Sequence, residues 1–355
     1  AVVLEEGGVG SHAALLTREM GLPAVSGIVG AVQEIAADSN ILVDGTHGRV
    51  IVNPVPDTKQ QFQETLDQSR TRHEQARNRC HEGVFAPKGT PVRVMANVGC
   101  SDHTRLARDY GADGVGLYRL EEFYLAQQHP PTEDTLLQTL RLCLGPLKHK
   151  PLTVRLLDAG GDKALPFLEL PEEQNPFLGQ RGVRLLQAYP DITQTQLGAL
   201  LTLSQAMDLR ILIPMVSLPE DIHVIRDMLD TLAEERGISS PPLGAMIETP
   251  VAALCADRMS EAADFLSIGT NDLTQYTMAA DRENAGVDHY YQDTHPAVLY
   301  LISRVLELCG TTPVSICGEL AANTSVTSQL IDMGVHDFSV APFLVPTVKE
   351  TIRSL

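Results

Sequence analysis

Basic residues, cysteines and long apolar runs are all scarce in this chain of 355 residues. It carries 27 lysines and arginines against 45 aspartates and glutamates, a formal net charge of −18, which argues against nucleic acid and anionic membrane surfaces as partners. No apolar run approaches the roughly 18 residues that a membrane-spanning helix needs, and no signal-peptide pattern opens the chain. We therefore expect no membrane insertion. The chain begins at Ala1 without a methionine, so we expect a piece of a longer protein.

The six cysteines are scattered, and we find no CxxC pair and no close cysteine–histidine cluster. This spacing argues against a zinc site and against a disulfide framework. Free thiols are the normal state in a reducing compartment, so we expect a cytoplasmic protein.

Three stretches of the chain differ in composition. Residues 1–54 are apolar and punctuated by glycine, with strand candidates at 41–43 and 50–52. Residues 57–87 are rich in Gln, Arg, Glu and His and hold few large apolar side chains, which is typical of a solvated helical linker. We place the domain boundary in this linker.

From about residue 90, eight short apolar runs recur, separated by segments that can carry helices. Fully apolar runs such as Ile211–Ile213 indicate burial on both faces, as in a parallel sheet. Eight strands in about 265 residues fit a (β/α)8 barrel, with a doubly wound open sheet as the alternative. The predicted strands are Val92–Val98, Gly114–Tyr118, Leu152–Asp158, Arg210–Val216, Leu243–Glu248, Asp264–Thr270, Pro313–Glu319 and Asp337–Ala341.

Chemically capable side chains stand at the ends of several predicted strands. In a barrel these carboxyl-terminal ends converge on one mouth, where barrel enzymes place their chemistry. The sequence therefore predicts a functional site at the mouth. The residues at these ends are Arg119, Arg155, Asp158, Glu248, Asn271, Asp272, Cys317 and Glu319.

Glu248 and Asp272 are hard oxygen ligands on neighbouring strand ends, the kind of pair that holds Mg²⁺ together with substrate oxygens. The alternative for Asp272 is a helix N-cap, because Thr270-Asn271-Asp272 could start the next helix. Cys317 could donate a proton at the mouth, or it could be a buried structural thiol.

Arginines could surround an anion that the global charge would otherwise repel. The candidates are Arg119, Arg155, Arg181 and Arg282, and the alternative for each is a surface ion pair. Arg155 fits that alternative poorly, because it lies inside the apolar run Leu152–Leu157 and a buried guanidinium needs a partner.

Glycines lead into Ser11-His12, and a helix-like run follows. This pattern puts His12 near a helix N-terminus, where free backbone N–H groups favour an anion. A histidine there can act as a nucleophile toward phosphorus, or it can serve as a local cap.

Long motifs resemble the phosphoenolpyruvate-utilising family. Residues 7–14 (GGVGSHAA) are similar to its phosphohistidine signature, and residues 269–276 (GTNDLTQY) and 316–320 (ICGEL) to its barrel signatures. Within the family, the resemblance is strongest to enzyme I of the bacterial sugar phosphotransferase system. The segments that carry it are 114–119 (GVGLYR), 157–163 (LDAGGDK) and 175–181 (NPFLGQR).

The resemblance implies a role for each candidate residue. His12 would take the phosphoryl group of phosphoenolpyruvate on Nε2 and pass it to the carrier protein HPr, while Cys317 would protonate the enolpyruvate to give pyruvate. Glu248 and Asp272 would bind Mg²⁺. The substrate contacts would be Arg119, Arg155, Arg181, Asn271, Asp272 and Arg282.

The resemblance also implies the domain organisation. We expect a partial phosphohistidine domain at 1–56, a helical linker at 57–88 and a phosphoenolpyruvate-binding (β/α)8 barrel at 89–355. The HPr-binding subdomain of enzyme I has no counterpart here, and Leu120-Glu121-Glu122 replaces the family's usual Thr-Glu-Phe, a weak sign of a fused multiphosphoryl transfer protein. We expect a homodimer formed through the barrel.

Two other functions remain open. Pyruvate phosphate dikinase and phosphoenolpyruvate synthase have similar barrels and use ATP. Alternatively, this chain alone is a phosphoenolpyruvate-binding and dimerisation module without full transfer activity.

Overall fold

The structure, a computed structural model, describes residues 1–6, 17, 22–161 and 165–355. His12 lies outside the described residues. The chain divides into two compact units, residues 1–79 with 274–292, and residues 80–273 with 293–355. Within the described part, no helix combines the length and apolar character needed to cross a membrane.

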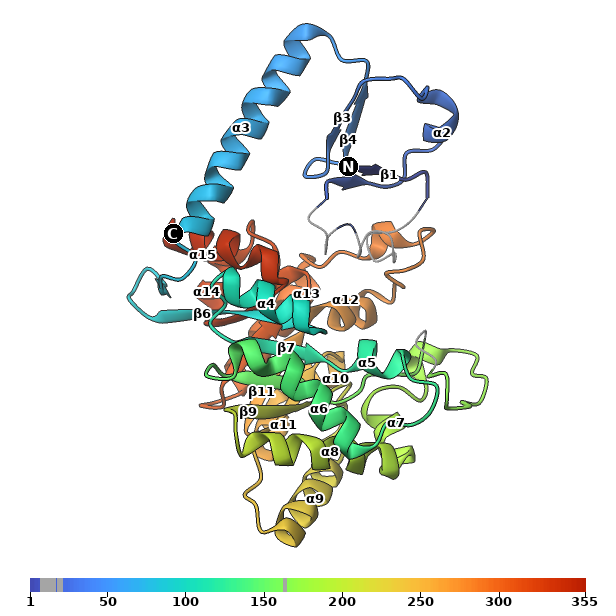
Figure 1. Ribbon diagram of the computed structural model, residues 1–355, viewed down its shortest axis with the longest axis vertical. Helices are drawn as coiled ribbons and strands as arrows, with labels where there is room; N and C mark the ends of the chain where they lie inside the picture. The colour runs from blue at the N-terminus through green and yellow to red at the C-terminus, as the bar shows by residue number, and fades with distance from the viewer. Residues whose placement is uncertain (7–16, 18–21, 162–164) are drawn as a thin grey trace. The chain divides into compact units, whose positions relative to one another are not determined.

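Eight parallel strands form a closed barrel in the second unit (Figure 1). Neighbours in sequence pair in order, and the last strand pairs with the first in the register Asp337↔Arg93, which closes the ring. The prediction of a (β/α)8 barrel is confirmed, and the open sheet is excluded. The strands are β6 (Pro91–Val98), β7 (Val115–Arg119), β8 (Leu152–Arg155), β9 (Leu209–Ile213), β10 (Leu243–Ile247), β11 (Phe265–Gly269), β12 (Val314–Cys317) and β13 (Asp337–Val340).

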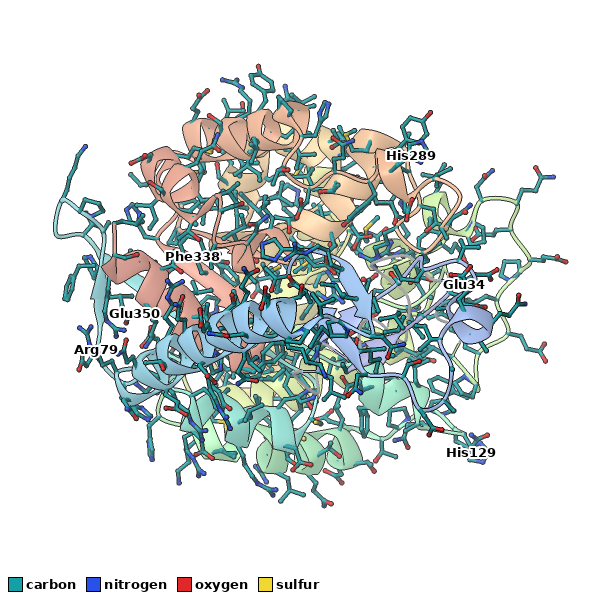
Figure 2. The ribbon with its side chains drawn as sticks, turned by 90° about the horizontal axis from the view of Figure 1, so that it is seen from above. Glu34, Arg79, His129, His289, Phe338 and Glu350 are labelled. Carbon is teal, nitrogen blue, oxygen red and sulfur yellow. The ribbon has the colours of Figure 1, made fainter. Side chains whose placement is uncertain are left out.

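The strands are buried because their apolar side chains meet either the barrel interior or a ring of helices. Phe338 of β13 is fully buried, whereas Glu350 on the surrounding helix α15 is partly exposed (Figure 2). The helices of this unit are α4 (Ser101–Asp109), α5 (Glu121–Leu125), α6 (Glu133–Leu144), α7 (Val183–Ala188), α8 (Pro190–Ser204), α9 (Pro219–Arg236), α10 (Pro250–Leu254), α11 (Ala256–Ala262), α13 (Pro296–Leu308), α14 (Thr327–Met333) and α15 (Val345–Arg353). Helix α12 (Thr270–Met278) starts in this unit.

Short 3₁₀ turns and one extra strand complete the second unit. The strand β5 (Val84–Phe85) pairs antiparallel with β6. The 3₁₀ turns are Gly145–Leu147, Pro176–Leu178, Leu320–Ala322 and Pro342–Leu344.

A buried lysine ties the last helix to the segments that precede β5 and β7. Lys349 on α15 is fully buried, and its ammonium donates to the carbonyl oxygens of Cys80 (3.0 Å) and Gly111 (2.7 Å) and to Asp113 Oδ1 (2.9 Å). These three acceptors match the three donors of an ammonium group. The charge is therefore compensated without water.

The first unit holds small sheets and a long helix. Strands β1 (Val2–Val3) and β2 (Ala24–Val25) are parallel, and β3 (Ile41–Asp44) and β4 (Arg49–Val52) form an antiparallel hairpin at the two predicted strand positions. The other elements are α2 (Ala31–Glu34), α3 (Pro56–Asn78) and the 3₁₀ turn Asp288–Tyr290. Helix α3 exposes nearly all of its side chains and buries only Ala76, which explains its polar composition.

Candidate active site

The polar residues predicted at the barrel mouth occupy the carboxyl ends of the strands. Arg119 and Arg155 end β7 and β8, and Cys317 ends β12. Glu248 directly follows β10, and Asp272 lies in the first turn of α12, after β11. Since all eight strands run parallel, these ends belong to one face of the barrel.

Arg119 and Arg155 are register partners on neighbouring strands. Register partners share one face of a sheet, and like charges placed opposite each other destabilise it. Carboxylates or an anionic ligand at this face would relieve that repulsion.

Arg155 is 6% exposed and satisfies its charge with two buried carboxylates. One terminal nitrogen donates to Glu121 Oε1 at 3.0 Å, and the other lies 3.3 Å from Asp158 Oδ2. Burial alone would lower the pKa of Arg155, but these carboxylates outweigh it and raise the pKa. Arg155 Nε and Glu121 Oε2 find no hydrogen-bond partner among the described residues, so both have capacity left for a ligand or water.

Arg181 bridges two aspartates from different strand ends. It donates to both oxygens of Asp158 at 3.1 Å and to both oxygens of Asp272 at 2.8 and 3.0 Å. Such bidentate contacts fix the planar guanidinium in position. The alternative of an N-cap for Asp272 is wrong, because α12 already begins at Thr270 and the carboxylate faces Arg181.

Glu248 is 1% exposed and accepts a 2.6 Å hydrogen bond from the backbone N–H of Met215. Met215 reaches this position with a φ of 55°, a conformation that is unusual for a residue with a side chain. Burial, reinforced by the charges of Asp272 and Asp158, raises the pKa of Glu248 to about 8. A cation beside these carboxylates would relieve the repulsion.

Cys317 and Asn271 belong to one connected turn. The Thr270 hydroxyl donates to the Cys317 carbonyl at 2.8 Å, and Asn271 Oδ1 accepts from the Glu319 N–H at 2.8 Å. Gly318, at φ 95°, allows this approach, since a Cβ there would collide with Thr270 and Asn271. Burial, with the nearby Glu248 charge, raises the pKa of Cys317 to about 11, so its thiol keeps its proton at neutral pH.

The six buried charged residues of the mouth do not balance one another. With all four acids ionised (Glu121, Asp158, Glu248, Asp272), the two arginines (Arg155, Arg181) leave −4 + 2 = −2, and the raised pKa of Glu248 is one way in which the metal-free protein reduces this excess. Buried charge of one sign is costly unless it is compensated. A hard divalent cation supplies that compensation, and oxygen donors are the ligands that Mg²⁺ prefers, so the residues fit it.

The predicted residue Arg282 lies in the segment 274–292, which belongs to the first unit. Its backbone N–H donates to Gln275 Oε1 at 3.3 Å. His12 falls outside the described residues.

Sequence reasoning assigned no role to Glu121, and it missed the N–H of Met215. Glu121 stands two residues after Arg119 at the same strand end, which was a usable signal. Met215 contributes only its backbone, and its residue type gave no signal.

These features define a class: a parallel (β/α)8 barrel whose mouth gathers arginines and buried carboxyl groups. Residues 73–355 match the family described as PEP-utilising enzyme, PEP-binding domain, and residues 1–48 match its mobile domain. The chain belongs to the PEP-utilising enzyme family, as the sequence motifs predicted.

Several curated relatives are named phosphoenolpyruvate-protein phosphotransferase. The proteins of Staphylococcus carnosus and Bacillus sp. (strain S) are 38% and 37% identical over 98% of this chain, and that of Haloferax volcanii is 36% identical over 98%. The chain spans 62% of the length of each of these relatives.

Proposed function

We propose that the barrel mouth binds phosphoenolpyruvate with Mg²⁺, and that the chain is part of a phosphoenolpyruvate-protein phosphotransferase. In this function the phosphoryl group passes to His12 and then to HPr, releasing pyruvate in the first step of sugar uptake by the phosphotransferase system. The observation that carries the proposal is the pairing of Arg119 with Arg155 beside a buried cluster in which four carboxyl groups outnumber two arginines. The names of the relatives support it.

Each chemical step has a candidate residue. Arg119, Arg155 and Arg181 bind and orient the phosphoryl oxygens, with Arg282 as a further contact, and Asn271 and Asp272 help to hold the substrate. Glu248 and Asp272 hold Mg²⁺, which when bound neutralises phosphoryl charge. Positioning and charge stabilisation are what phosphoryl transfer needs most.

The transfer balances as a simple exchange. The bond between phosphorus and the enol oxygen breaks, and a bond forms between phosphorus and Nε2 of His12. The enolate left behind takes a proton at its methylene carbon, and the thiol of Cys317 supplies it. The raised pKa of Cys317 suits a donor that must hold its proton until the enolate forms.

Calorimetric titration of phosphoenolpyruvate into this chain tests the binding step. We expect binding with Mg²⁺, loss of at least about tenfold in affinity with EDTA, and a similar loss in Glu248→Gln, because the cation compensates the buried carboxylates. Glu235→Gln, an exposed acid in the last turn of α9 and so at the opposite end of the barrel, is the matched control. Equal affinity with and without Mg²⁺ would contradict the proposed metal site.

Transfer and assembly are tested separately, because the chain spans only part of its relatives' length. We propose domains at 1–56, 57–88 and 89–355, a cytoplasmic location and a homodimer formed through the barrel. Light scattering should then give twice the protomer mass at micromolar concentration. We expect this chain alone to bind phosphoenolpyruvate but to phosphorylate HPr poorly. Labelling of His12 by ATP in the full-length protein would instead favour the dikinase class.

A further inference from the structure

A second cluster of ligand atoms lies at the same end of the barrel, outside the buried charge network. Atoms of Cys100, His103 and Glu122 that can bind a metal all lie within 4.8 Å of one another. Cys100 and His103 are half-buried, and Glu122 is exposed, so solvent reaches the group. The sequence-based expectation of no close cysteine–histidine cluster is therefore wrong.

Local structure explains why these residues meet. Cys100 follows β6 as the N-cap of α4, and His103 stands three residues later in the first turn, a spacing at which side chains face each other. Glu122 follows the neighbouring strand β7, in the first turn of α5. Two adjacent strands of the barrel thus bring the three residues to one place.

Gly99 shapes the space between them. A Cβ at Gly99 would collide with the carboxylate of Glu122, so the absence of a side chain lets that carboxylate approach the loop. The N–H of Gly99 donates to His103 Nδ1 over a long 3.4 Å, which holds the imidazole toward the same loop. A bond this weak yields readily to a stronger ligand for the nitrogen.

These three ligands suit a different class of cation from the one that suits the barrel mouth. A thiolate and an imidazole are poor ligands for Mg²⁺, whereas thiolate, imidazole and carboxylate together are the usual ligands of Zn²⁺. We propose that Cys100, His103 and Glu122 form a binding site for Zn²⁺ or a chemically similar transition-metal ion.

The nearby thiol of Cys143 does not complete the set. Cys143 on α6 is buried and hydrogen-bonded to Tyr118. Three protein ligands leave one tetrahedral position for water, which makes the bound ion exchangeable. The ion also links the first turns of α4 and α5, next to Glu121, the buried partner of Arg155.

Cobalt(II) titration of the reduced chain tests the site, because thiolate coordination gives Co²⁺ a charge-transfer absorption that oxygen ligands do not. We expect one equivalent to bind with this band, and Zn²⁺ to displace it. Cys100→Ser should abolish the band, and His103→Gln and Glu122→Gln should each weaken Co²⁺ binding at least about tenfold.

Matched variants separate this site from others. Cys255→Ser removes another half-buried thiol that is also a helix N-cap, and it should keep the band. Cys317→Ser and Glu248→Gln alter the barrel mouth and should keep it too. A band that survives Cys100→Ser, a band lost in Cys317→Ser, or no Co²⁺ binding by the reduced wild-type chain would each overturn the proposal. Circular dichroism of metal-free Cys100→Ser confirms that the variant is folded.

Discussion

Glu248 shows how the protonation of a single buried side chain is coupled to stability. Its carboxylate has one backbone donor, Met215, and it lies among other acids, so the neutral form is favoured in the metal-free protein. Such a group resists ionisation unless a nearby cation compensates its charge. The contribution of Glu248 to the free energy of unfolding therefore depends on pH.

Glu248→Gln should flatten the pH dependence of stability in the absence of divalent ions. The pKa of Glu248 lies near 8 in the folded chain and near 4.5 in the unfolded chain. Between these values only the folded state holds the proton, so stability falls as pH rises, by at most about 1.4 kcal/mol per pH unit. Urea unfolding of wild type and variant from pH 5 to 8.5 measures it. Equal slopes of stability against pH in wild type and variant would contradict the raised pKa of Glu248.

Some of these residue-level features were readable from the sequence. Arg155 inside an apolar run required a buried partner, and the structure supplies Glu121 and Asp158. The bidentate hold of Arg181 on Asp272 was not readable, because it joins residues 91 positions apart. Pairings of that separation are fixed by the closed sheet and leave no local pattern.

At the scale of elements, all eight barrel strands were predictable because fully apolar runs mark strands buried on both faces. Their ends were less predictable. The run Leu152–Asp158 leaves the strand after Arg155, since the N–H groups of Leu157 and Asp158 bond to the side chains of Gln196 and Glu121. Where the site begins, side-chain oxygens thus replace the carbonyl oxygens of the neighbouring strand as hydrogen-bond acceptors.

Gly318→Ala should be far more costly than Gly334→Ala. Both glycines have positive φ, 95° and 109°, so both variants carry backbone strain of about 1–3 kcal/mol. At Gly334 nothing lies within 4 Å of the added carbon, whereas at Gly318 it would sit 2.7 Å from Asn271 Oδ1. We expect an additional loss of roughly 2 kcal/mol for Gly318→Ala in chemical unfolding. Equal losses would show that the turn relaxes freely.

At the scale of the whole barrel unit, its first and last elements are joined by a buried charge. The ammonium of Lys349 on α15 donates to three acceptors near the start of the unit. No sequence pattern identifies these acceptors as its partners. This contact and the β13–β6 pairing hold the ring closed.

Lys349→Met should destabilise the unit by roughly 3 kcal/mol, because it removes the cation beside Asp113 and leaves two buried carbonyl oxygens without their donor. Lys88→Met is the control, since Lys88 is exposed and should change stability by less than about 0.5 kcal/mol. Thermal unfolding of both variants measures the difference. A loss no larger than that of Lys88→Met would mean that the charge is dispensable.

The pairing of β13 with β6, the seam that closes the barrel, also determines when the chain can complete its folding during synthesis. Arg93 and Asp337 are 244 residues apart, so a ribosome must synthesise nearly the whole barrel before the seam can close. Until then residues 93–96 of β6 lack their partner strand, and such an open edge is the kind of surface that recruits chaperones or aggregates. Closure over so long a separation is also slow. The yield of native protein in the cell should therefore depend more on the speed of translation and on chaperone supply than on the final stability of the barrel.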